Sequence, residues 1–327
     1  MPVNETFSTY SDWTYGAAVG VYVLAMLFSL VEQAFGRRTK VVARARELVG
    51  AGAPVDHTAD DSTTDSTTDT AADEVLETDE PARAGRAERF GRMSVSLIVL
   101  GVLLHVTALA LRGLATGRVP WGNMYEFGAT LSLAAVVTWL VMLRKFPIRH
   151  LSVWLLLPVI LLMFLGGVLL YTTAAPVQPA LQSYWLVIHV FSIALGSGMV
   201  LVPGVVSVLY LIKTRKPAWA TRLPDAEVLD QVAYRTTIFA FPIYTAGVIF
   251  GAIWAESAWG RFWGWDPKET VAFIAWVVYA AYLHSRATAG WRGSRAALIN
   301  IVGFAMMVFN LFFINLVVAG LHSYASG

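Results

Sequence analysis

The apolar residues of this chain gather in eight long runs that alternate with shorter polar segments. Each run holds about twenty residues, the length of an α-helix that crosses the roughly 30 Å hydrocarbon core of a bilayer. Backbone groups in lipid must be hydrogen-bonded internally, and a helix achieves this within one segment. The pattern therefore predicts an all-α, polytopic membrane protein with about eight transmembrane helices, near residues 15–35, 93–111, 123–143, 151–171, 185–212, 236–254, 268–286 and 296–319.

Composition agrees with this reading, and charge adds an orientation. Hydrophobic residues make up 57% of the chain and charged residues 14%, with a mean hydropathy of +0.59. Lys and Arg concentrate in cytoplasmic loops. If the first loop faces the cytoplasm, twenty of the 24 basic residues are cytoplasmic, and the external ones are only Arg112, Arg118, Arg261 and Lys268. We expect both termini to be external, and we expect the first span to be retained because no basic residue precedes it.

The polar segments divide the chain into three parts. Residues 1–35 hold the N-terminal segment and first span, residues 36–92 form a cytoplasmic loop, and residues 93–327 hold seven spans. Within the loop, residues 56–80 carry ten acidic residues and no Lys or Arg. Low hydrophobicity and like charge prevent a packed core, so this insert is expected to be a disordered tether.

Tryptophan is concentrated between the sixth and seventh spans. Four of the twelve tryptophans, Trp254, Trp259, Trp263 and Trp265, lie within twelve residues, with Arg261 and Lys268 beside them. Interfacial anchoring explains one or two such residues. The cluster also offers stacking faces for a large aromatic ring and cations for its carboxylates, as a porphyrin requires. With no cysteine in the chain, haem could not attach covalently to this chain.

Part of this segment has a structural explanation. Asp266 suits a helix N-cap, Pro267 suits the first helical position, and Glu269 completes a capping box. These residues alone would begin the seventh span. The asparagines of the last span, Asn300, Asn310 and Asn315, are expected to form hydrogen bonds between helices.

Three histidines are candidate haem ligands. His189 and His322 fall at the predicted outer side, near the tryptophans, where neutral imidazoles could bind iron from both faces. His284 falls near the cytoplasmic end of the seventh span, roughly 28 Å from Trp265 along a helix, too far to bind the same iron. His105, in the second span, is a competing candidate, although an interhelical hydrogen bond is a stronger alternative for it than for His284.

The segment Trp259–Thr270 resembles the WWD signature of haem-handling membrane proteins. Residues 120–126, 181–189, 282–284 and 320–324 resemble the CcsA/ResC branch of cytochrome c biogenesis System II. The acidic insert is a departure from that family. On this resemblance the haem-contacting residues are Trp254, Trp259, Arg261, Trp263, Trp265, Asp266 and Lys268, and the axial ligands of iron are His189, His322 and His284.

The resemblance implies a subunit of a cytochrome c synthase in the plasma membrane. It would carry non-covalent haem b to the extracytoplasmic face and present it for thioether attachment to Cys-x-x-Cys-His motifs of apocytochrome c. No residue is a candidate general acid or nucleophile. The resemblance implies that synthase (lyase) activity occurs only together with a CcsB/ResB-type membrane protein. Thiol reductants of the apocytochrome and membrane lipid are further expected partners, and nucleic acid is not. The alternatives are a CcmC-like haem transporter that passes haem to a chaperone and a non-catalytic membrane assembly scaffold.

Overall fold

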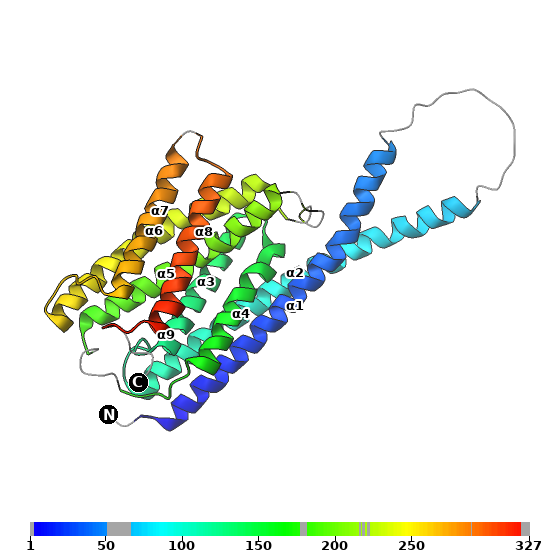
Figure 1. The fold of residues 1–327 in the computed structure, drawn as a ribbon. Coiled ribbons are helices and arrows are strands. Elements are labelled where there is room, and N and C mark those ends of the chain that lie inside the picture. Colours follow the sequence, from blue (N-terminus) through cyan, green and yellow to red (C-terminus); the bar gives the residue numbers. More distant parts are fainter. Residues whose placement is uncertain are drawn as a thin grey trace.

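The computed structural model describes residues 3–50, 67–176, 182–215, 217, 220, 223–288 and 290–321, with backbone only for 36–50 and 67–82. Every regular element in this part of the chain is a helix (Figure 1). The bounds are α1 Glu5–Gly50, α2 Thr67–Thr116, α3 Met124–Lys145, η1 Arg149–Leu151, α4 Ser152–Leu169, α5 Tyr184–Thr214, α6 Ala226–Trp259, α7 Pro267–Ala287, α8 Ser294–Phe309, the π-helix η4 Asn310–Ile314 and α9 Asn315–Val317.

The helices run back and forth between two ends of a bundle. At one end, the N–H of Asn4 donates to the carbonyl of Ala115, and the N–H of Leu321 donates to Asp266 Oδ1, both at 2.9 Å. This end, which also holds the α6–α7 connection at residues 260–266, is called the tryptophan end. The opposite end holds the α7–α8 connection and is called the basic end. The first and last described residues therefore lie at the same end of the bundle (Figure 1).

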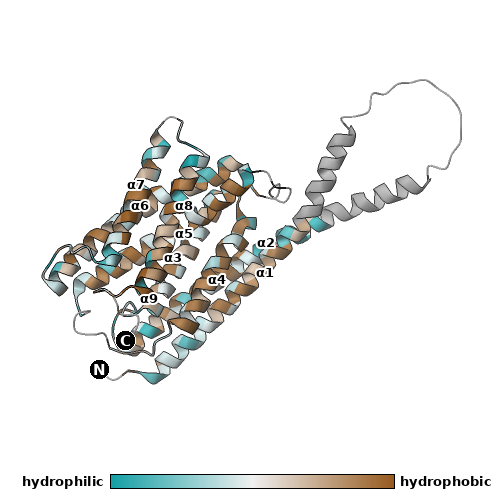
Figure 2. Ribbon diagram, in the orientation of Figure 1, coloured by the Kyte–Doolittle hydropathy of each residue, from teal (hydrophilic) through white to brown (hydrophobic). Residues whose placement is uncertain are grey.

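The prediction of a polytopic helical membrane protein is confirmed. Within the described residues, seven helical stretches are long and apolar enough to cross a membrane: 5–35, 83–116, 124–145, 149–169, 184–214, 226–259 and 294–317. Hydrophobic residues are distributed along the length of these helices (Figure 2). The eighth expected span, α7, has 21 residues and runs between the same two ends, but polar residues at both of its ends lower its mean hydropathy.

The loop expected to face the cytoplasm has one feature that the sequence did not predict. Helix α2 begins at Thr67 and so includes residues 67–80 of the acidic insert. Ala, Glu and Leu are frequent in residues 71–77, and these residues favour helix even when no core packs against them. The rest of the insert, residues 56–66, lies outside the described residues.

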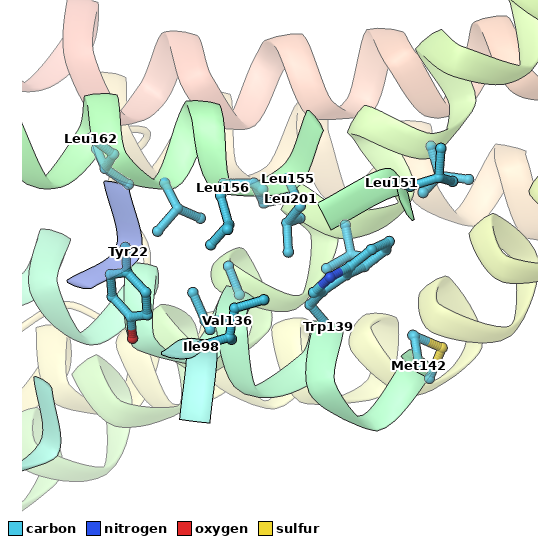
Figure 3. Close-up of a cluster of buried hydrophobic side chains, with 14 of the residues drawn as sticks. Tyr22, Ile98, Val136, Trp139, Met142, Leu151, Leu155, Leu156, Leu162 and Leu201 are labelled. Atoms are coloured by element: carbon cyan, nitrogen blue, oxygen red, sulfur yellow. The ribbon is translucent and has the colours of Figure 1, made fainter. Parts of the chain in front are cut away.

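The main core lies between α1, α2, α3, α4, α5 and the first turns of α6 (Figure 3). Trp139 of α3 is almost fully buried there, and its Nε1–H donates to Ser152 Oγ at 3.0 Å. Helix α5 packs closely against α6: a Cβ on Gly196 would come within 2.8 Å of the Tyr244 backbone, and one on Gly247 within 2.9 Å of the Ile193 backbone. Small residues thus let the two helices approach, and the next turns of both form the site described below.

Candidate ligand-binding site

The α2–α3 connection is held by one buried carboxylate. Glu126, in the first turn of α3, is 1% exposed and accepts hydrogen bonds from Gly122 N at 2.8 Å, Arg118 Nη1 at 2.8 Å and Arg112 Nε at 3.1 Å. These bonds fix the loop that carries Trp121. The Trp121 Nε1–H donates to Thr130 Oγ1 at 3.1 Å.

The α6–α7 connection is also held by carboxylates. The predicted capping box is confirmed, since Asp266 caps α7 and Glu269 bonds back to the N–H of Asp266. Glu269 Oε2 accepts from Gly264 N at 3.0 Å and Asp266 N at 3.1 Å. The loop contains one strained residue, Trp265, with a φ of 56°. Such a φ is uncommon in a bulky residue and persists only where the surroundings impose it.

A cavity opens between these two connections and extends into the bundle. Its empty volume, counted together with the open mouth, is about 1240 Å³. The walls are mainly apolar. The lining residues come from the α2–α3 connection, α3, α5, α6, the α6–α7 connection, α7, α8 and η4, and include Trp121, Phe127, His189, Ser197, Tyr244, Gly251, Trp254, Trp263, Lys268, Met307 and Asn310.

His189 is held in one orientation on the α5 wall. Its Nδ1 lies 2.8 Å from the carbonyl oxygen of Gly247 on α6, and because a carbonyl only accepts, Nδ1 carries the proton. The imidazole stacks on Trp254, with centroids 6.0 Å apart and planes 7° apart. Gly251 of α6 also lies against the His189 imidazole. A Cβ at this position would come within 2.7 Å of His189 Cε1. This tautomer puts the lone pair on Nε2, the form in which imidazole binds a metal.

Lys268 brings a cation into the same cavity. It occupies the first turn of α7, and its Nζ donates to Asn315 Oδ1 of α9. Asn310, on the π-helix η4, also lines the cavity and donates from Nδ2 to the carbonyl of Lys268 at 3.2 Å. The expected interhelical role is confirmed for Asn310, Asn315 and Asn300, whose Nδ2 lies 3.4 Å from Thr237 Oγ1.

The structure brings only some of the expected contact residues to the cavity. His189, Trp254, Trp263 and Lys268 line it, whereas Trp259 packs behind Trp254 with centroids 4.7 Å apart. Arg261 lies over Trp259, 3.8 Å from Glu269, and covers Gly264. Asp266 is used by the helix cap and by Leu321. Trp265 is 66% exposed and does not line the cavity. His322 lies outside the described residues.

The other two histidines lie elsewhere. His284 is exposed one turn before the end of α7, at the basic end and away from this cavity. His105 is fully buried on α2, with its ring against Tyr15 and Tyr22 of α1 at centroid distances of 6.0 and 6.1 Å. It does not line the cavity either.

Some residues that line the cavity were not predicted from the sequence. Ser197, Tyr244 and Met307 form the inner wall, and no local pattern marks them because they meet only through tertiary packing. Gly251 did carry a signal, since Gly247 and Gly251 form a small-x-x-x-small pair, which is typical of a close helix approach. Here that approach admits the histidine ring.

Comparison with known proteins gives a family for this arrangement. Residues 121–322 match the Cytochrome C assembly protein family. The Cytochrome c biogenesis protein CcsA of Parasynechococcus marenigrum (strain WH8102) is 35% identical over 267 residues, covering 70% of this chain and 85% of the relative. The chain belongs to this family. The CcsA protein of Chlamydomonas reinhardtii is 35% identical over 242 residues, covering 71% of this chain and 69% of the relative. The resemblance expected from the sequence is thus confirmed.

The fold has a relative of known structure. The chain is similar to the Cytochrome c Heme Lyase CcmF with a TM-score of 0.57 and 20% identity, and the match covers 92% of this chain but 46% of that one. At this identity the likeness concerns the fold alone. The match includes most of the helical bundle that encloses the cavity.

Proposed function

We propose that this chain is the membrane subunit of a cytochrome c synthase that binds haem b without a covalent bond and presents it at the tryptophan end to apocytochrome c. Membership of the cytochrome c assembly family and the CcsA relatives support a haem-handling role in cytochrome c biogenesis. The observation that carries the proposal is His189, whose Nδ1–H bond to Gly247 leaves Nε2 as the metal-binding nitrogen in a cavity walled by indoles.

The donor set fits haem as a substrate. A porphyrin needs a flat apolar space, an axial ligand for iron and cations for two propionates. The cavity offers Trp121, Trp254 and Trp263 as apolar surface, His189 as ligand and Lys268 as cation. Arg261, whose Nη1 lies 3.8 Å from the cavity-lining Glu269, is a second candidate cation. His322, proposed as the opposite axial ligand, follows Leu321, which is hydrogen-bonded to Asp266 beside the cavity.

The chain would act by positioning. Thioether bonds form between the vinyl groups of haem and two cysteine thiols, and these cysteines must belong to the apocytochrome because this chain has none. His189 and the apolar walls would hold the ring at the tryptophan end so that its edge meets the incoming thiols, which converts a bimolecular encounter into an oriented one. A CcsB/ResB-type partner and reductants that keep the thiols reduced complete this proposal.

The spectrum of the purified chain tests haem binding. We expect an imidazole-ligated haem in detergent, lost in His189→Gly and partly recovered when free imidazole is added, because imidazole fills the vacated axial position. An unchanged spectrum in His189→Gly would exclude the ligand assignment. A chain that never binds haem would instead support the assembly scaffold.

A CcmC-like haem carrier would also bind haem, so haem binding alone does not distinguish it from a synthase. The two are separated by production of cytochrome c in cells that express this chain with its CcsB-type partner and lack other maturation proteins. A synthase forms covalent cytochrome c in those cells. A carrier binds haem there, but no covalent product forms until a chaperone and a lyase are added.

A further inference from the structure

The last transmembrane helix changes its helical register where it reaches the cavity. Residues 310–314 form the π-helix η4 between α8 and α9. In an α-helix, residues five apart point about 140° away from each other, whereas the i to i+5 hydrogen bonding of a π-helix brings such residues toward one face. Asn310 and Asn315 are five apart, and both contact Lys268. Short π-helices of this kind often occur at functional sites.

This cluster contains a donor that nothing in the described chain satisfies. Asn315 does not itself line the cavity but contacts Lys268, which does. It is 5% exposed, and its Nδ2 is buried with no hydrogen-bond partner among the described residues. A buried polar group in that state is costly unless a ligand or water completes it. Its Oδ1 accepts from Lys268 Nζ, which fixes the orientation of the amide and leaves Nδ2 as the donor. Asn310 Oδ1 is also buried without a partner, but as an acceptor it takes no part in binding an anion.

The nearby acids do not supply the missing acceptor. Asp266 accepts from the N–H groups of Lys268 and Leu321. Glu269 accepts from two backbone N–H groups through Oε2 and lies 3.8 Å from Arg261, while its Oε1 is buried and accepts no hydrogen bond from the described residues. A carboxylate is the ligand group that best accepts hydrogen bonds from both an ammonium and an amide N–H, because its negative charge strengthens both bonds.

We propose that Lys268 and Asn315 form a carboxylate subsite that binds one propionate of the porphyrin. This inference rests on the proposed function and extends it, since it names the group that sets the orientation of the ring. With iron at His189 and one propionate at Lys268, the ring has two attachment points on different helices, α5 and α7. The vinyl edge is then directed to a defined part of the mouth.

The test compares iron protoporphyrin IX with its dimethyl ester, whose two propionates are neutral. Each is titrated into the detergent-purified full chain, with tryptophan quenching and the Soret band as readouts and His189→Gly to measure partition into micelles. We expect the native chain to bind the free acid at least about tenfold more tightly than the ester, as loss of a charged hydrogen bond implies.

The variants assign that preference to residues. Lys268→Met and Asn315→Leu are expected to lose most of it while they bind the ester as the native chain does, so a misfolded variant is recognised by its failure to bind the ester. Lys268→Arg is expected to retain it. Lys145→Met, an exposed lysine at the basic end, serves as the matched control and is expected to leave the preference unchanged.

The outcomes separate this inference from the proposed function. Equal binding of acid and ester by the native chain, with an intact His189-dependent spectrum, would overturn the carboxylate subsite and leave haem binding in place. A preference that persists in Lys268→Met and Asn315→Leu would also overturn it. Failure of the native chain to bind either porphyrin would overturn both proposals.

Discussion

The orientation of His189 depends on two positions of the neighbouring helix α6. The carbonyl of Gly247 selects the tautomer, and the absence of a side chain at Gly251 makes room for the ring. Neither residue would contact the iron itself. They act through His189, as outer partners of metal-binding histidines commonly do.

Substitution of Gly251 tests this arrangement at the scale of one methyl group. In Gly251→Ala the added Cβ would come within 2.7 Å of Cε1 and 2.8 Å of Nδ1 of His189, so the ring must turn away from Gly247. We expect haem affinity to fall at least about tenfold, equivalent to roughly 1.4 kcal/mol, measured by titration of the purified variant.

A matched substitution controls for the change from Gly to Ala. A Cβ at Gly128 of α3 meets no atom within 4 Å, and Ala is the better helix former. Gly128→Ala should therefore keep the native affinity and thermal stability. Equal haem affinity in both variants would show that the His189 ring is free to move and that the stacked geometry is not needed.

At the scale of elements, Glu126 joins two connections of the tryptophan end. Through Arg112 and Arg118 it links the α2–α3 connection to the carbonyl groups of Thr172 and Ala175, which follow α4. Arg112 is 1% exposed and its guanidinium also lies 3.7 Å from Asp12 of α1. The network thus joins α1, α2, the α2–α3 connection, α3 and the segment that follows α4.

Removal of the central carboxylate should be costly. Glu126→Ala leaves two guanidinium groups around an empty position, and breaking a buried pair in this way costs about 3–5 kcal/mol. We expect a marked fall in the thermal midpoint in detergent, whereas Glu227→Ala, at an exposed position of α6, should stay within about 0.5 kcal/mol of the native chain. A normal midpoint for Glu126→Ala would mean that the network contributes little.

Helices and caps were largely predictable because they are local. Twenty-residue apolar runs and the Asp266 capping box depend on neighbours along the chain, and both appear where expected. The inner wall of the cavity was not predictable, because Ser197, Tyr244 and Met307 meet only when three helices pack. The π-helix also escaped prediction, since its register is a property of the backbone that residues 310–314 do not reveal by composition. Arg261 and Asp266 hold the α6–α7 connection in place, and their expected contact with the ligand stays a prediction.

For the whole molecule, the unequal distribution of basic residues predicts which end faces the cytoplasm. Ser257 of α6 is exposed near the tryptophan end, and Ser294 is exposed at the start of α8 at the basic end. Because the native chain has no cysteine, Ser257→Cys and Ser294→Cys are conservative single labels. We expect an impermeant thiol reagent to label position 257 in intact cells and position 294 only after permeabilisation. The reverse result would place the cavity at the cytoplasmic side and refute the proposed presentation of haem to an external apocytochrome.

The position of His284 leads to a prediction about the assembled complex. From Pro267 to His284 the helix rises roughly 26 Å, so His284 cannot share an iron with His189. Its exposure at the periphery of the bundle leaves room for a second protein to supply the opposite ligand, and an ionisable residue near membrane depth is a functional candidate by default. We expect His284→Ala to lower haem content only when a CcsB/ResB-type partner is co-expressed, with the spectrum of the chain alone unaffected.

His105 provides the contrast for this experiment. It is enclosed between α1 and α2 against Tyr15 and Tyr22, so a porphyrin could reach it only if those helices separated. We therefore expect His105→Ala to change thermal stability but not the haem spectrum, either in the chain alone or in the complex. If the chain expressed alone carries a second six-coordinate haem that His105→Ala removes, the two helices do separate, and the ligand attributed to the partner belongs to this chain.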